Sequence, residues 1–96
     1  MKFEIAPKST EIEANWHDAR LYCFALNIDG KTGWRLPSNE ELNDIYESEN
    51  DLEKSLYWSS TEFDTGGAWR QSFHFGFQAN GYKDTNVYVR AIRSVI

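Results

Sequence analysis

The feature that most constrains the fold is a short corner where an apolar stretch meets the start of a helix. Trp34 and Leu36 are large apolar residues two positions apart, as in a buried extended segment. Pro37 ends that segment, because it lacks an N–H and disfavours a helical conformation in the residue before it. Ser38 and Glu41 form the S-x-x-E pattern of a capping box, in which each side chain binds the backbone N–H of the other residue. The sequence therefore predicts a strand that turns sharply into a helix at Ser38.

Length and composition indicate one compact domain over residues 1–96. Hydrophobic residues make up 41% of the chain and aromatic residues 16%, which is enough for a packed core built largely from rings. The net charge of −5 argues against a sequence-independent grip on nucleic acid, which requires clustered Lys and Arg. The sequence shows no membrane-spanning stretch and no signal peptide. We therefore expect the protein in the cytoplasm of a bacterium or phage-infected cell, or in a virion.

Few residues have the pattern of metal ligands or nucleophiles. Cys23 is the single cysteine, so no intramolecular disulfide can form, and we expect its side chain to be buried. His17 and His74 lie far apart in the sequence, and neither has zinc-ligand spacing. The acidic segment 47–54 is interpreted as a solvated connection; a calcium site is the alternative, although EF-hand spacing is missing. We expect no cofactor and no dependence on metal.

Local patterns predict an α+β domain of order β-α-α-β-β-β, with two helices packed on a small, mainly antiparallel sheet. The expected elements are a strand at Lys2–Ala6, a polar connection at Lys8–Glu13, helices at Ala14–Asn27 and Asn39–Tyr46, and strands at Leu56–Thr61, Trp69–Phe77 and Val87–Ile96. Asn80-Gly81 predicts a type I′ hairpin turn. The last strand is apolar on both faces, so we expect it in the middle of a sheet.

Several motifs together resemble a known family. They are Trp16…Tyr22-Cys23, Gly33-Trp34-Arg35-Leu36-Pro37, Tyr57-Trp58-Ser59-Ser60-Thr61-Glu62, Asn80-Gly81 and Val89-Arg90-Ala91-Ile92-Arg93. From about residue 14 to residue 94 the chain resembles the Legionella collagen-like protein C-terminal (Lcl C-terminal) domain. The resemblance implies a compact C-type-lectin-like fold, related also to sulfatase-modifying domains, with paired terminal strands and a sheet that presents ligands. The calcium-and-sugar loop of C-type lectins and the second cysteine of formylglycine-generating enzymes are missing, so neither activity is carried over.

The loop end of such a domain is the expected contact region, because loops on a rigid scaffold commonly carry recognition. The candidate contact residues are Phe63, Asp64, Tyr82, Lys83 and Asn86. The residues expected to form the structural motif are Trp34, Arg35, Leu36, Pro37, Trp58, Ser59 and Arg90. Two interpretations of Arg35 and Arg90 stay open. They are either a cationic pair for a carboxylate or sulfate ligand, or partners of Glu41, Glu62 or backbone carbonyls within the fold.

We therefore expect a non-enzymatic recognition domain that binds a protein or a glycan through its loop end. In a phage, such a domain would be a virion accessory or an inhibitor of a host protein. The alternative is a small enzyme whose cleft uses Arg35 or His74. The identity of the ligand and a homo-oligomeric state are left open by the sequence.

Overall fold

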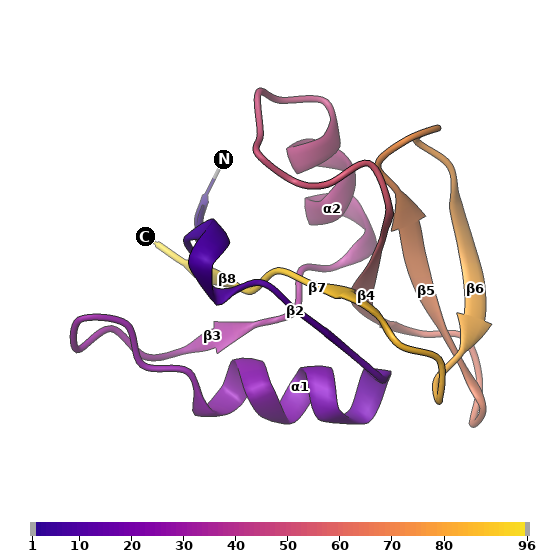
Figure 1. The fold of residues 1–96 in the computed structure, drawn as a ribbon, viewed down its shortest axis with the longest axis horizontal. Helices are drawn as coiled ribbons and strands as arrows, with labels where there is room; N and C mark the ends of the chain where they lie inside the picture. The colour runs from indigo at the N-terminus through magenta and orange to yellow at the C-terminus, as the bar shows by residue number, and fades with distance from the viewer. Residues whose placement is uncertain (1, 96) are drawn as a thin grey trace.

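The computed structural model describes residues 2–95, which form two β-sheets and two α-helices (Figure 1). In chain order the elements are β1 (Phe3–Ile5), the 3-10 turn η1 (Lys8–Thr10), β2 (Ile12–Ala14), α1 (Trp16–Ala25), β3 (Trp34–Arg35), α2 (Asn39–Tyr46), β4 (Leu56–Glu62), β5 (Gly67–Ser72), β6 (Gln78–Tyr82), β7 (Val87–Val89) and β8 (Ile92–Ser94). The sheets have the strand orders β1-β8-β3 and β2-β7-β4-β5-β6. All neighbours are antiparallel except β4 and β7, so the predicted α+β class is confirmed.

The five-stranded sheet separates two hydrophobic cores. Trp58 of β4 packs with Trp16 and Cys23 in the core beneath α1. The preceding residue, Tyr57, points to the other face of the strand and packs with Leu42 in the core beneath α2. Figure 1 accordingly shows α1 and α2 on opposite sides of the strands. One strand of alternating orientation thus contributes to both cores.

The corner predicted from Trp34 to Glu41 is confirmed. Trp34 is buried, and the capping box is complete. Ser38 Oγ accepts the Glu41 N–H at 3.2 Å, and Glu41 Oε1 accepts the Ser38 N–H at 2.8 Å. α2 has the predicted bounds, and α1 lies within the predicted range, with Asn15 as its N-cap. These local signals therefore fix both helix starts.

The segment Lys8–Glu13 is more than the connection predicted for it. After the turn η1, residues 12–14 form β2, which pairs antiparallel with β7. A strand of three residues is too short to show an alternating pattern, and the strand it pairs with lies at the other end of the chain. The first predicted strand is confirmed as β1, which pairs with β8.

The hairpin turn predicted at Asn80-Gly81 is wrong. Both residues lie inside β6, where Asn80 is paired with Trp69 of β5. The chain reverses instead at residues 73–77. There Ser72 Oγ accepts two backbone N–H groups at 3.3 and 3.0 Å, and Gly76 adopts a φ of 90°. This serine- and glycine-based turn ends the predicted long strand at Ser72, in spite of the alternating aromatic residues that follow.

The predicted final strand is in fact two strands in two sheets. β7 lies in the interior of the five-stranded sheet and β8 in the centre of the three-stranded sheet, so the interior position expected from the sequence is correct for both. The chain crosses between the sheets at Arg90 and Ala91, which are buried. Ile96, the last residue of the predicted strand, lies outside the described residues.

Candidate functional site

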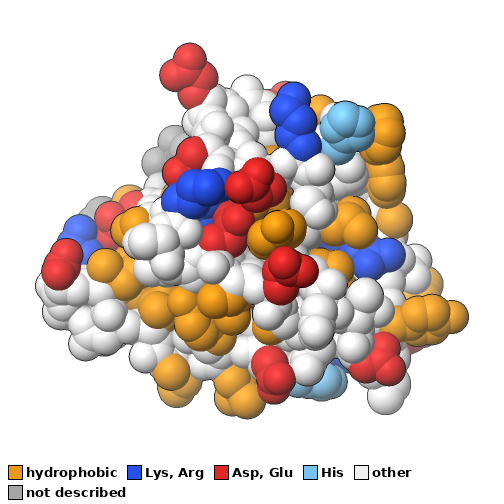
Figure 2. All heavy atoms as spheres, viewed as in Figure 1, with side chains coloured by type: hydrophobic (Ala, Val, Ile, Leu, Met, Phe, Trp, Pro, Cys, Tyr) orange, Lys and Arg blue, Asp and Glu red, His pale blue; other side chains and the backbone are white. Residues whose placement is uncertain are grey.

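Two surface grooves of similar volume concentrate exposed apolar and basic side chains. The loop-end groove, of about 590 Å³, is lined by Phe63, Asp64, Thr65, Gly66, Gly67, Arg70, Asn80, Gly81, Tyr82 and Thr85. The helix groove, of about 570 Å³, is lined by His17, Arg20, Leu21, Phe24, Trp34, Arg35, Leu36 and Ser60. Figure 2 shows hydrophobic side chains gathered at the surface below α1 and along the outer side of the β5–β6 hairpin.

Hydrogen bonds within the β4–β5 loop hold Phe63 at the rim of the loop-end groove. The N–H groups of Phe63 and Asp64 donate to the Gly67 carbonyl at 2.9 and 3.1 Å. Asp64 Oδ1 accepts the Gly66 N–H at 3.0 Å. The Phe63 ring packs edge-on against Trp69, with 5.8 Å between ring centroids, and yet remains 53% exposed. A positioned ring with a free surface is suited to contact a ligand.

Arg70 supplies the positive charge of the loop-end groove. Its guanidinium lies across Gly81, where a Cβ atom would be 2.6 Å from Arg70 Cζ, so the glycine provides the space that the guanidinium occupies. Within residues 2–95, Arg70 forms no ion pair, and neither does Arg20 of the helix groove. The other three arginines are ion-paired: Arg35, Arg90 and Arg93. Each groove therefore contains one arginine without a carboxylate at ion-pair distance.

Three of the five predicted contact residues come together in the loop-end groove. Phe63 and Asp64 reach it from the β4–β5 loop, and Tyr82, which is 78% exposed, reaches it from the end of β6. Asn86 is exposed but lines neither of the two grooves. The structure thus brings together residues that are 18 positions apart and more in the chain, by placing a loop beside a strand end.

Lys83 lies beneath the groove and not at its surface, which differs from the exposed position predicted for this residue. Its side chain is buried because the ammonium group is bound from inside the domain. Nζ lies 2.8 Å from Glu62 Oε2, donates to the Thr65 carbonyl at 3.1 Å and sits 4.6 Å from the centroid of the Trp16 ring. Lys83 therefore fastens the β4–β5 loop to the end of β6 and supports the groove from below.

Seven residues that line the loop-end groove are not among the predicted contact residues: Thr65, Gly66, Gly67, Arg70, Asn80, Gly81 and Thr85. The sequence predicts Asn80 in a turn and Arg70 within the long strand Trp69–Phe77. Their proximity depends on the register of β5 with β6, which pairs Arg70 with Ala79 and so places it diagonally opposite Gly81. A glycine opposite a long basic side chain is the one signal that could have indicated this contact.

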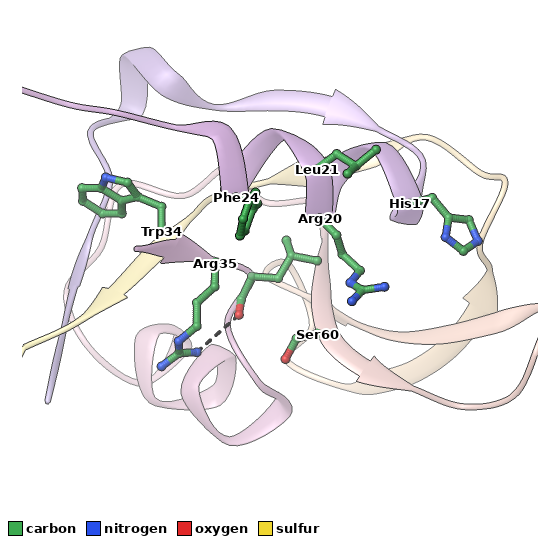
Figure 3. A pocket seen from close by; sticks show the side chains of 8 residues that line it. His17, Arg20, Leu21, Phe24, Trp34, Arg35 and Ser60 are labelled. Carbon is green, nitrogen blue, oxygen red and sulfur yellow. Dashed lines mark hydrogen bonds between the residues drawn. The ribbon is translucent and has the colours of Figure 1, made fainter. Parts of the chain in front are cut away.

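The helix groove lies between α1 and the corner (Figure 3). In Figure 3, Leu21, Phe24 and Arg20 project from α1, and the Arg20 side chain extends toward the side of Ser60. The Arg20 guanidinium lies 4.8 Å from the centroid of the Trp16 ring. Arg35 points away toward α2 (Figure 3). The groove is therefore mainly apolar, with a basic residue on each side.

Arg35 is held by the corner that it belongs to. Its Nη1 and Nη2 donate to the two carboxylate oxygens of Glu41 at 2.7 and 2.8 Å, and Nη2 also donates to Ser94 Oγ at 2.9 Å. These contacts agree with the interpretation in which Arg35 is a partner of Glu41 within the fold. The guanidinium and the Ser38 N–H together lower the pKa of the Glu41 carboxyl from 4.5 to about 2.

This shift predicts a pH dependence of stability. Because the pKa of Glu41 is depressed in the folded state, its contribution is present above about pH 4.5 and is lost as the pH falls toward 2. We expect Glu41→Gln to lower the free energy of unfolding near neutral pH. The difference from the wild type should shrink on acidification through that window. Urea unfolding of both proteins between about pH 2 and pH 7 measures the difference in stability. A difference that does not change with pH would contradict a depressed pKa for Glu41.

Of the two residues that the enzymatic alternative offers, Arg35 or His74, only Arg35 lines one of the two grooves. Arg35 lines the helix groove, whereas His74 lies on the turn between β5 and β6, exposed and edge-on to Phe75 at 4.3 Å between ring centroids. Cys23 is fully buried, and burial raises the pKa of its thiol to about 12. Ser59 is also buried, and its Oγ accepts the Thr61 N–H at 3.0 Å. No pairing of a nucleophile with a base is present among these residues of the described chain.

Arg90 is enclosed by the fold. Its Nε donates to Glu11 Oε2 at 3.0 Å, and its Nη1 donates to Asp51 Oδ1 at 2.8 Å and to the Ala6 carbonyl at 3.2 Å. Its partners are thus two acids that the sequence did not suggest, together with a backbone carbonyl, which was expected. Among residues 2–95 no group of three or more His, Cys, Asp or Glu side chains is placed to hold a metal ion. None of the described helices is long and apolar enough to cross a bilayer.

Together these features define a small α+β domain with two surface grooves, one of them flanked by exposed aromatic rings. The chain belongs to the Lcl C-terminal domain family, whose model matches residues 4–93. This match confirms the family resemblance of the Trp-Arg-Leu-Pro and Tyr-Trp-Ser-Ser-Thr motifs. Comparison with curated proteins finds no match.

Proposed function

We propose that the chain is a non-enzymatic recognition domain that binds a protein or glycan partner through its loop-end groove. The observation that carries the proposal is that Phe63 and Tyr82, both largely exposed, line the same groove as Arg70, which forms no ion pair in the described chain. Large apolar side chains are usually buried, and a positioned aromatic pair beside an arginine without an ion pair is typical of a binding surface. In a phage or bacterial setting, such a domain would serve as a virion accessory or act on a host protein.

The groove rests on a rigid support, which favours recognition. The loop is closed by its own hydrogen bonds and tied to β6 by the buried Lys83. Binding therefore requires little ordering of the loop, and a preorganised surface loses less entropy on association. No observation in the described residues favours the enzymatic alternative, because the guanidinium of Arg35 is bound by Glu41, and His74 lines neither groove.

The proposal predicts that removing the two exposed rings weakens binding without unfolding the protein. The variant Phe63→Ser/Tyr82→Ser should bind at least about tenfold more weakly, because contact residues of this kind contribute about 1–2 kcal/mol each. Its melting temperature should stay close to that of the wild type, since surface substitutions change stability by only about 0.5 kcal/mol. Binding is measured on a glycan array and with displayed random peptides, followed by interferometry on the hits.

The matched control is Leu21→Ser/Phe24→Ser, which removes two similarly exposed side chains from the helix groove. We expect this control to bind as the wild type does. If the control loses binding and the loop-end variant keeps it, the recognition surface is the helix groove and the proposal is wrong.

A further inference from the structure

β6 is an open edge of the five-stranded sheet. It is the outermost strand, and within residues 2–95 no strand pairs with its outer side. With five residues it is the longest edge strand of the described sheets, and the segment Gln78–Tyr82 contains no charged residue and no proline. Proteins commonly protect such edges with charges, prolines or bulges, because a bare edge is a template for another strand. The edge at β6 lacks these protections.

The register identifies which backbone groups are free. The Ser72 N–H donates to the Phe77 carbonyl at 2.9 Å, so odd-numbered residues of β6 direct their N–H and C=O groups toward β5. The even-numbered residues Gln78, Asn80 and Tyr82 therefore direct theirs outward. Of these outward groups only the Tyr82 carbonyl is taken in the described chain, by an N–H of the following turn at 3.1 Å. The rest are available to a further strand.

The two faces of this edge differ in chemistry. Trp69 and Tyr82 lie on one face of the β5–β6 ribbon, together with the Phe63 ring that packs on Trp69, so this face is aromatic. Arg70 and Gly81 lie on the opposite face, which therefore carries the guanidinium of Arg70. A strand added at the edge would present its successive side chains alternately to these two faces.

We propose, on the basis of the proposed function, that the ligand of the loop-end groove is an extended segment of a partner protein that adds to β6 as a further strand. The segment contains an acidic residue next to an aromatic or aliphatic one. The acidic side chain points toward Arg70, and the neighbouring apolar side chain points to the other face, toward Phe63 and Tyr82. A peptide backbone offers the repeating N–H and C=O groups that match Gln78 and Asn80, and a glycan does not. The Arg70 guanidinium pairs with the carboxylate.

The test uses peptides selected from a displayed library of random linear sequences on the immobilised domain. We expect the selected peptides to contain an acidic residue next to an aromatic or aliphatic one. The Asn80→Pro variant removes one outward N–H and leaves the ladder to β5 intact, since proline is tolerated on a free edge. It should bind the peptides about tenfold more weakly or worse, the usual effect of losing a buried hydrogen bond.

Asn80→Ala is the matched control, because it removes the same side chain and keeps the N–H, so it should bind nearly as the wild type does. Arg70→Gln should weaken acidic peptides and leave their amide analogues unaffected. If Asn80→Pro unfolds, hydrogen exchange of the wild-type protein tests strand addition instead. The amides of Gln78 and Asn80 should then become protected from exchange when peptide is added.

Three results would overturn the inference: a selection without binders, full binding by Asn80→Pro, or amides that stay unprotected in the complex. If a glycan binds instead and its binding depends on Phe63 and Tyr82, the proposed function stands and strand addition fails. If neither peptides nor glycans depend on these two rings, the proposed function and the inference fail together.

Discussion

Replacing Arg90 with methionine is expected to lower the free energy of unfolding by about 3–5 kcal/mol, because it leaves a buried carboxylate without its counter-charge. The Arg90 side chain is 2% exposed and the Glu11 side chain 7% exposed. Nη2 of Arg90 also lies 2.9 Å from Glu11 Oε2, although without hydrogen-bond geometry. In the variant, Glu11 would keep the hydroxyl of Tyr57, at 2.8 Å, and lose the guanidinium.

Urea unfolding of the wild type and Arg90→Met gives the difference in stability. Adding Glu11→Gln to the variant should restore about 1–3 kcal/mol, since a neutral amide costs less to bury than an unpaired carboxylate. If Arg90→Met is as stable as the wild type within about 1 kcal/mol, the guanidinium does not neutralise a buried charge.

Trp58→Ala is expected to cost about 3–5 kcal/mol, as for other buried aromatic residues truncated in a core. Trp58 is fully buried, and its Nε1–H donates to the Ala14 carbonyl at 2.9 Å, which joins β4 to the end of β2. The substitution would therefore leave a cavity and an unpaired carbonyl. Thermal and urea unfolding measure the loss.

Two further variants separate the contributions of Trp58. Trp58→Phe keeps most of the ring volume and loses the hydrogen bond, so its cost should be nearer 1–2 kcal/mol. Phe24→Ala removes a ring that is 84% exposed, and should change stability by no more than about 0.5 kcal/mol. An equal loss in Trp58→Ala and Phe24→Ala would mean that the core beneath α1 is not packed as described.

Local signals were sufficient to predict the corner and both helices. The Ser38–Glu41 box and the Asn15 cap each involve residues three positions apart, so the sequence contains the whole interaction. The short strand β2 and the split of the last strand were missed, because each depends on pairing across most of the chain. The Arg90 partners illustrate this, since Glu11 is 79 residues away and Asp51 is 39 residues away. No local pattern could select them.

The candidate site was only partly predictable for the same reason. Phe63, Asp64 and Tyr82 were expected at the loop end, because loops on a rigid scaffold commonly carry recognition. Lys83 has the same sequence context, yet its ammonium group is bound inside the domain by Glu62. Arg70 reaches the groove only through the register of β5 with β6. Tertiary packing therefore determines which polar side chains point outward.

The positions of β7 and β8 bear on how the chain folds as it is synthesised. These strands come last in the sequence of elements, and each lies in the interior of its sheet. A nascent chain can therefore complete the five-stranded sheet only after residue 89 has left the ribosome, and the three-stranded sheet only after residue 94. Before that point the apolar residues that cover β7 and β8 are exposed to the cell, and pairings between distant segments form slowly. A translational stop before residue 87 would thus release a chain with both cores open, which is a substrate for chaperones and proteases.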